Sequence, residues 1–173
     1  MNERAALDDV GPIVTEVGAP AALVFQMLGA IGQGRQRPGA GADVLARDGD
    51  ALICDFWTTV RLPFGGSRTV RTREAVRLVP PDRVEYEHLD GPVCGLRESI
   101  TVEPIGDHRS RLVYRGTYDS RSRLARLIFR FLSKGIIERA VDDHFSELRQ
   151  RAEARAARSR AFPVGPAVEP VDD

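Results

Sequence analysis

Apolar and polar residues alternate along most of the chain from residue 43 to residue 118, in short runs separated by turn residues. A period of two is typical of strands that bury one face, and turns about every ten residues are typical of sequential antiparallel strands. Asp48-Gly49 is the clearest turn, because this dipeptide favours a two-residue hairpin. We therefore predict six consecutive strands, over residues 43–47, 51–60, 67–79, 83–89, 95–103 and 109–118.

Two shorter elements precede these strands. Residues 12–17 alternate and are rich in β-branched side chains, which predicts another strand. Residues 19–31 carry apolar side chains at helical spacing, and Pro20 suits the first turn of a helix. The chain is thus expected to begin with a strand and a helical segment.

Residues 122–156 have the pattern of a helix, but the apolar stripe along it changes direction. The first part of the stripe consists of Leu124, Leu127, Ile128 and Phe131, and the second of Ile137, Val141, Phe145, Leu148 and Ala152. On a regular α-helix these two parts differ by roughly 100°. We predict a short helix, a kink or break near Ser133–Gly135, and a long helix that clamps the sheet while the short one caps a cavity mouth.

This order of elements predicts one α+β domain over residues 11–160, with a seven-stranded antiparallel sheet. Such a sheet cannot bury its apolar face alone, and the C-terminal helix is the element long enough to cover it. Residues 1–10 are polar and are expected to be flexible. Residues 161–173 contain prolines without periodicity and are expected to be disordered.

The alternation also assigns candidate ligand-binding residues to the inner face of the sheet. In each strand we choose the frame that keeps charged residues out, apart from a few ionisable and hydroxyl groups. The strands supply Phe56, Thr72, Glu74, Tyr86, His88, Glu98, Tyr114 and Tyr118, and the helix supplies Phe131 and His144.

Two interpretations of these polar groups stay open. In the first, Glu74, Glu98, His88 and His144 approach one another in a partly dry cavity, where shifted pKa values suit general acid–base chemistry. The tyrosines then supply hydroxyl donors to the same ligand. In the second, each acid pairs with an arginine at the rim of the sheet, and His144 is a boundary histidine with satisfied hydrogen bonds. Convergence of Glu74, Glu98 and His88 favours an enzyme, and neutralised acids favour a carrier.

Composition and charge exclude several classes. The formal net charge is zero and the pI is about 6.8, so we expect no nucleic-acid partner. The three histidines lack the spacing of a metal site, and Cys54 and Cys94 fall in no metal-binding cluster, so no metal and no cofactor are expected. The first ten residues lack the apolar core of a signal peptide, which favours a cytoplasmic location.

The chain resembles the START-like superfamily (SRPBCC), which includes the polyketide cyclase/dehydrase and lipid-transport group. The stretches that carry the resemblance are "VTEVGAPAALVFQMLG" (14–29), "VEYEH" (84–88), "SITVEPIGDHRSRLVYRGTY" (99–118) and "ERAVDDHFSELRQRAE" (138–153). The resemblance covers about residues 10–157. It implies a helix-grip fold, in which a curved seven-stranded antiparallel sheet wraps around a long C-terminal helix and encloses a cavity.

Two functions follow as expectations. The first is binding or carriage of a hydrophobic small molecule, such as a lipid, an isoprenoid or a polyketide, between the sheet and the C-terminal helix. The second is a polyketide cyclase or dehydratase that uses the Glu, His and Tyr groups as acids and bases. The arginine-rich segment Arg121–Arg130 could in addition touch an anionic membrane surface transiently. We expect a monomer or a homodimer.

Overall fold

The computed structural model of the chain describes residues 8–33, 41–61, 65–119 and 123–161. The predictions for residues 1–7, for the tail after residue 161 and for Arg121 lie outside these ranges. One boundary is corrected, because strand β1 begins at Asp8 and buries Val10. Residues 8–10 therefore belong to the sheet and are not a flexible end.

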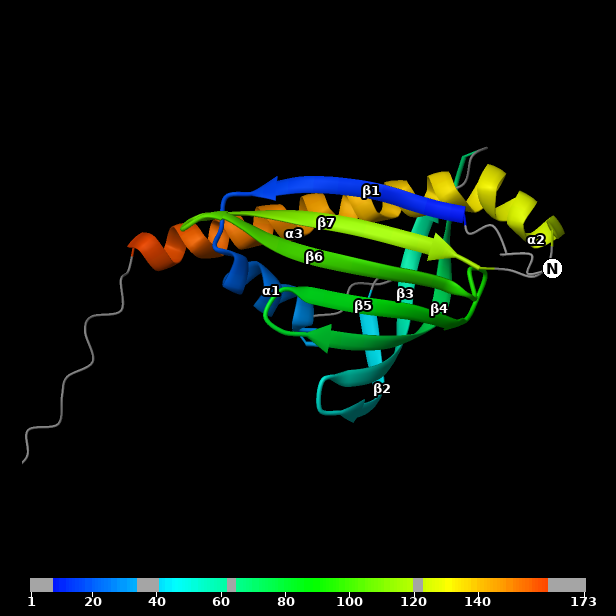
Figure 1. Cartoon of the computed structure of the whole chain (residues 1–173), viewed down its shortest axis with the longest axis horizontal. Coiled ribbons are helices and arrows are strands. Elements are labelled where there is room, and N and C mark those ends of the chain that lie inside the picture. The colour runs from blue at the N-terminus through cyan, green and yellow to red at the C-terminus, as the bar shows by residue number, and fades with distance from the viewer. Residues whose placement is uncertain (1–7, 34–40, 62–64, 120–122, 162–173) are drawn as a thin grey trace, which may run out of the picture.

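Seven antiparallel strands form one curved sheet in the order β1-β7-β6-β5-β4-β3-β2, which confirms the predicted architecture (Figure 1). Apart from β1, each strand pairs with the next along the chain, as short hairpin connections require. The strands are β1 (Asp8–Val17), β2 (Gly41–Asp48), β3 (Ala51–Arg61), β4 (Ser67–Val79), β5 (Arg83–Asp90), β6 (Leu96–Gly106) and β7 (Arg109–Tyr118).

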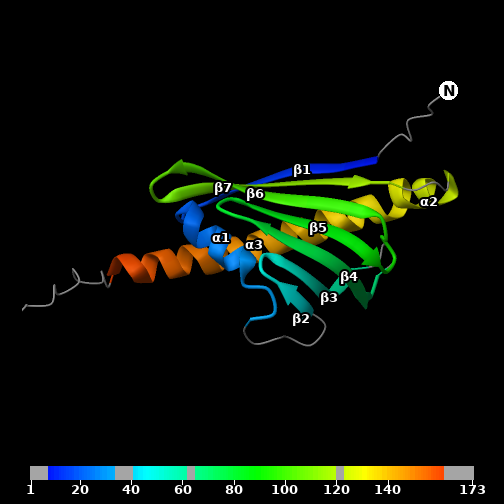
Figure 2. The ribbon, with the colours of Figure 1, turned by 60° about the horizontal axis from the view of Figure 1, so that its bottom comes forward.

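The helices lie on one side of this sheet. They are α1 (Ala21–Gly29), α2 (Arg123–Ile128), the π-helical turn η1 (Phe129–Ser133) and α3 (Lys134–Ala161). Helix α3 runs along the sheet and extends beyond it at its C-terminal end, while α2 lies at the opposite end of the molecule (Figures 1 and 2). No helix in the described ranges is long and apolar enough to cross a bilayer.

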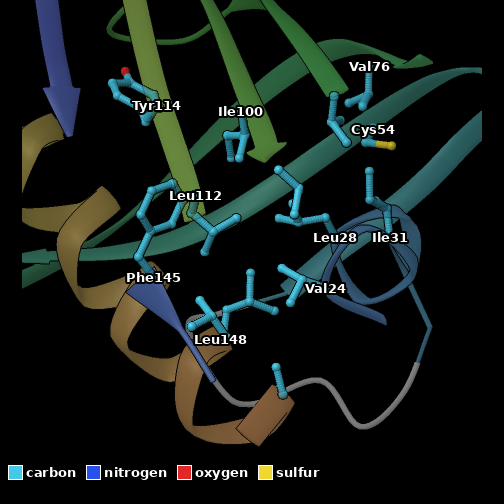
Figure 3. Close-up of a cluster of buried hydrophobic side chains, with 14 of the residues drawn as sticks. Val24, Leu28, Ile31, Cys54, Val76, Ile100, Leu112, Tyr114, Phe145 and Leu148 are labelled. Atoms are coloured by element: carbon cyan, nitrogen blue, oxygen red, sulfur yellow. The ribbon is translucent and has the colours of Figure 1, made fainter. Parts of the chain in front are cut away.

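The core lies between the inner face of the sheet, α1 and α3. Figure 3 shows Phe145 and Leu148 of α3 directed into the same cluster as Leu112 of β7 and Val24 of α1. Phe145 is fully buried, and so is Ala152 two turns further along the helix. The second part of the predicted stripe is therefore the face that clamps the sheet.

The kink or break predicted near Ser133–Gly135 is present only as an irregularity that ends at Ser133, and the helix does not break at Gly135. The irregularity is the π-helical turn Phe129–Ser133, after which α3 continues through Gly135 without interruption. A π turn holds more residues than an α turn, so the side chains before it rotate relative to those after it by roughly a further quarter turn. This rotation adds to the roughly 100° that already separates the two parts of the apolar stripe. The two parts therefore point to nearly opposite sides of the helix.

The first part of the stripe consequently faces outward. Leu124 is 66% exposed, Leu127 54%, Ile128 48% and Phe131 75%. Phe129 takes the inward position and is 2% exposed. The prediction that this face packs over a cavity mouth is therefore not supported, because a helical wheel assumes a constant number of residues per turn. Ligand binding by Phe131 stays a prediction.

One hydrogen bond ties α3 to the junction between β1 and α1. The backbone N–H of Gly18 donates to Oε1 of Glu153 at 2.9 Å, and this bond holds the pKa of Glu153 below its usual range. We expect Glu153→Ala to lower the free energy of unfolding by about 1 kcal/mol, a modest value because the carboxylate is partly exposed. Urea denaturation measures this effect. Glu153→Gln keeps an acceptor for Gly18 and should retain most of the stability; an equal loss in both variants would assign the effect to the charge instead.

Candidate functional site

Strand register brings four polar residues together on the inner face of the sheet. Glu74 of β4 lies opposite His88 of β5, and Tyr86 of β5 lies opposite Glu98 of β6. Residues directly opposite on antiparallel strands point to the same face with their Cβ atoms close together. The predicted inward frames of β4, β5 and β6 are therefore confirmed, and their ionisable members are neighbours.

Hydrogen bonds join these groups into a chain. Nε2 of His88 lies 2.7 Å from Oε2 of Glu98, and the hydroxyl of Tyr114 donates to Oε1 of the same carboxylate at 2.5 Å. At the other end, Oγ1 of Thr72 donates to Oε1 of Glu74 at 2.5 Å. The Thr72, Glu74, His88, Glu98 and Tyr114 side chains are called the inner polar chain below.

One link in the inner polar chain is open. Nδ1 of His88 lies 3.5 Å from Oε1 of Glu74, and this buried nitrogen has no hydrogen-bond partner among the described residues. The side chains of His88 and Glu74 are only 8% and 9% exposed. A buried polar atom without a partner is costly, so a site that retains one commonly uses it for a ligand, a water molecule or a proton.

Burial and neighbouring charges shift the pKa values of the two central groups. Burial raises the pKa of Glu74 above its ordinary value, although the charge of His88 and the Thr72 hydroxyl oppose the shift. Burial lowers the pKa of His88, but the hydrogen bond to Glu98 and the charge of Glu74 outweigh it, and the net pKa is raised. Both groups consequently hold a proton more readily than they do in water.

The Tyr114 hydroxyl occupies space that is open because Gly116 has no side chain. A Cβ atom built on Gly116 would lie 2.8 Å from the hydroxyl of Tyr114, closer than carbon and oxygen approach without a bond. Gly116 therefore leaves the space in which the phenol reaches Glu98. Tyr114 is 1% exposed, and burial is the largest cause of its raised pKa, followed by the charge of Glu98. The phenol keeps its proton at neutral pH and can donate it in a hydrogen bond.

The other predicted ligand residues differ in where they lie relative to the inner polar chain. The rings of Phe56 and Tyr86 meet edge to face with centroids 6.3 Å apart, on the same inner face as the polar chain. Tyr118 stacks on Phe129 with centroids 3.9 Å apart, so it is a core residue beneath η1. His144 is exposed, its ring lies against Phe145, and it is not among the partners of the polar chain. The prediction that His144 faces the acids is therefore not supported.

The alternative in which arginines neutralise the acids applies to a different carboxylate. Asp55, on the outer face, accepts hydrogen bonds from Arg73 at 2.7 and 2.9 Å and from Arg71 at 3.1 Å. The Arg73 guanidinium lowers the pKa of Asp55 to about 2, with Arg71 adding to the effect. Among the arginines whose side chains the structure describes, none lies within salt-bridge distance of Glu74 or Glu98.

Glu74, His88 and Glu98 also have the donor types of a metal site. One ligand atom from each lies within 4.8 Å of the others. A metal ion uses one nitrogen of an imidazole, whereas the His88 ring directs Nε2 to Glu98 and Nδ1 towards Glu74. This orientation suits a ring that passes or holds a proton between two carboxylates better than it suits a chelate.

The inner face around this chain is incompletely covered. Helix α3 contacts β1 and α1 more extensively than β3. Phe56, Thr72 and Tyr86 point inward yet keep part of their surface accessible, as do Ile137 and Val141 on the facing helix. A pocket of about 680 Å³ is lined by residues of β2 to β7, including Tyr86, Glu98 and Gly116, and no described helix residue lines it.

The shifted pKa values predict how stability depends on pH. Because Glu74 and His88 bind protons more tightly in the folded state, they stabilise the fold at low pH. We expect that contribution to fall as the pH rises above about 4.5 and 6.5, the ordinary values of the two groups. Asp55 acts in the opposite sense, and its contribution is lost as the pH falls from 3.8 towards about 2.

Urea denaturation across this pH range measures how stability falls on the acid side and on the alkaline side. Maximal stability is expected at about pH 4 to 4.5, with a first decline above that range and a further one above about pH 6.5. His88→Gln should flatten the decline on the alkaline side, and Asp55→Asn should flatten the decline on the acid side. A wild-type protein whose stability rises steadily from pH 5 to pH 9 would contradict the assignment.

Two residues near the site were not singled out from the sequence. Cys54 lies opposite Glu74 across β3 and β4, is fully buried, and has a pKa raised by burial and by the Glu74 carboxylate. The alternation predicts that Cys54 lies on the inner face of β3, but it does not give the register that sets Cys54 opposite Glu74. Phe129 was missed because the helical wheel placed it away from the stripe, and only the π turn moves it inward.

With this geometry in hand, the likeness to solved structures defines the class of fold. The chain has a helix-grip fold that is similar to the folds of aromatase/cyclase and START superfamily proteins. The Zhui aromatase/cyclase from a Streptomyces species aligns with a TM-score of 0.64 at 17% identity, over 92% of this chain and 99% of that one. The protein TTHA0849 from Thermus thermophilus aligns with a TM-score of 0.65 at 18% identity, over 86% and 99%.

A START superfamily protein from Mycobacterium smegmatis aligns with a TM-score of 0.54 at 14% identity, over 88% of this chain and 97% of that one. No family model and no curated protein matches the sequence. At these identities the neighbours establish the fold alone.

Proposed function

We propose that the protein is a cyclase- or dehydratase-type enzyme that performs acid–base chemistry on a hydrophobic, carbonyl-bearing small molecule. The observation that carries the proposal is the position of His88, held between Glu74 and Glu98 on the inner face, where neither acid forms a salt bridge to an arginine whose side chain is described. Groups with raised pKa values and a buried, unpartnered nitrogen are typical of catalytic sites. The cyclases among the structural neighbours are consistent with this class of reaction.

In the proposed reaction the ligand lies in the incompletely covered space between the sheet and α3. The apolar surfaces of Phe56 and Tyr86 contact its carbon skeleton. A carboxylate of the inner polar chain removes a proton from the carbon next to the carbonyl, and a protonated member, His88 or the Tyr114 hydroxyl, donates to the oxygen. The hydrogen bonds along the chain let the proton return to its starting position after turnover.

Carriage of a hydrophobic ligand without chemistry is the second candidate. It is favoured by the apolar residues that surround the polar chain, because most of the inner face consists of Val, Leu and Ile. Under this proposal the polar groups only orient the ligand through hydrogen bonds. We propose a cytoplasmic location for either function.

Hydrogen–deuterium exchange distinguishes the two candidates. The probe is 2-acetonaphthone, a hydrophobic aryl ketone with exchangeable protons next to its carbonyl. An enzyme of the proposed class speeds exchange of these protons in D₂O, as followed by NMR, and Glu98→Gln slows the catalysed rate about 100-fold. Binding by fluorescence without faster exchange would favour the carrier, and neither binding nor exchange would contradict both proposals for this ligand class.

A further inference from the structure

The outward face of α2 and η1 is apolar, whereas a helix that packs only within its own domain normally has a polar outward face. Leu124, Leu127, Ile128 and Phe131 are each between 48% and 75% exposed. Burying one such side chain is worth about 1.5–3 kcal/mol, and here four lie together on one segment. Contiguous exposed apolar patches of this kind mark interaction sites.

The segment is held in this orientation and cannot simply turn its apolar face inward. Phe129 occupies the inward position, and its ring stacks on Tyr118 at 3.9 Å with an angle of 10° between the planes. The π turn places Phe129 and Phe131 on different sides of the same helix. Rotating Phe131 towards the core would therefore remove Phe129 from it.

Positive charge accompanies the apolar face. From residue 123 to residue 137 the sequence contains three arginines and one lysine and no acidic residue. Arg130, between Phe129 and Phe131, is exposed. The protein as a whole is neutral, so the sequence concentrates positive charge in the segment that also carries the exposed leucine, isoleucine and phenylalanine side chains.

The shape of the surface favours a lipid surface over a folded partner. Helix α2 lies at one end of the molecule, at the end opposite the C-terminus of α3, and forms a projecting surface (Figures 1 and 2). A projecting row of apolar side chains needs a complementary groove in a protein partner, whereas a bilayer interface accepts it by displacement of lipid. Cationic residues beside such a row add about 1 kcal/mol each at an anionic surface.

We infer that the α2–η1 segment docks the protein on anionic lipid surfaces, with Leu124, Leu127, Ile128 and Phe131 inserted and Arg130 at the headgroups. The segment lies in the interface and does not cross it, since α2 and η1 have only six and five residues. The inference does not depend on the reaction proposed above. Docking of this kind is reversible, because the inserted area is small.

Vesicle flotation tests this inference with the full chain. The probes are vesicles of phosphatidylcholine alone and of phosphatidylcholine mixed with phosphatidylglycerol, at about 0.1 M and about 1 M NaCl. We expect the protein to float with the anionic vesicles at low salt and to be released at high salt. Leu127→Ser with Phe131→Ser should lower the bound fraction at least about tenfold.

Val14→Ser with Leu45→Ser is the matched control, because these side chains are 53% and 51% exposed on other elements, and it should bind like the wild type. Arg130→Glu provides a second variant that weakens binding through charge alone. Failure to float with anionic vesicles, or equal binding by the Leu127/Phe131 variant, would overturn the inference. A wild-type dimer that this variant dissociates, without vesicle binding, would assign the face to a second copy of the chain.

Discussion

Glu98→Leu is expected to lower the free energy of unfolding by about 3–5 kcal/mol, the largest effect of any single change in the inner polar chain. The carboxylate accepts hydrogen bonds from His88 and Tyr114, which are both buried. Leucine has a similar volume but no acceptor, so both donors lose their partner. For a chain of this size the melting temperature should fall by about 10 °C.

Glu98→Gln is the matched control for this change. The amide keeps an acceptor oxygen and nearly the same shape, so we expect a loss of only about 1 kcal/mol. Thermal and urea unfolding of the two variants separate hydrogen bonding from charge. If Glu98→Leu were as stable as the wild type, the two donors would have found other partners, and the carboxylate would not be a structural requirement.

Phe145→Ala is expected to destabilise the fold by about 3–5 kcal/mol, because it leaves a cavity where α3 meets the sheet. Phe145 is fully buried in the cluster that contains Leu112 and Val24. Phe131→Ala is an internal comparison on the same helix, since Phe131 is 75% exposed, and it should change stability by less than about 0.5 kcal/mol.

Urea denaturation of the two phenylalanine variants measures the difference directly. The two substitutions remove the same atoms from positions 14 residues apart, so the difference reports which part of the stripe clamps the sheet. Equal losses in the two variants would mean that Phe131 is packed against the domain in solution. That result would also contradict the outward orientation on which the lipid-docking inference rests.

Much of the fold follows from the alternation in the sequence. A period of two assigns each strand residue to a face, and a hairpin connection forces consecutive strands to pair, so the antiparallel order required no further information. The same reasoning placed Glu74, His88 and Glu98 on the inner face. Their contact depends on the register between β4, β5 and β6, which the alternation alone does not determine.

The helix was predicted less well than the sheet, for a physical reason. A helical wheel propagates a fixed angle per residue, so a single π turn misplaces every side chain on one side of it. Phe131 belongs to the predicted apolar stripe but is exposed, whereas Phe129 lies off that stripe and is buried. The part of the stripe that contains Phe145 was placed correctly. Gly135 was a misleading signal because glycine disfavours a helix only weakly, and the surrounding residues outweigh it.

The close approach of Gly116 to Tyr114 has a consequence for how this sequence can diverge. A Cβ atom at position 116 would lie 2.8 Å from the hydroxyl oxygen of Tyr114 and 3.3 Å from Cζ, the ring carbon that carries this oxygen. The oxygen is therefore the main obstacle to a methyl group. We expect Gly116→Ala alone to cost about 1–3 kcal/mol and to cost clearly less in a Tyr114→Phe background, as a double-mutant cycle would measure. A lineage could therefore fill position 116 most easily after losing the phenol oxygen, and with it one member of the inner polar chain.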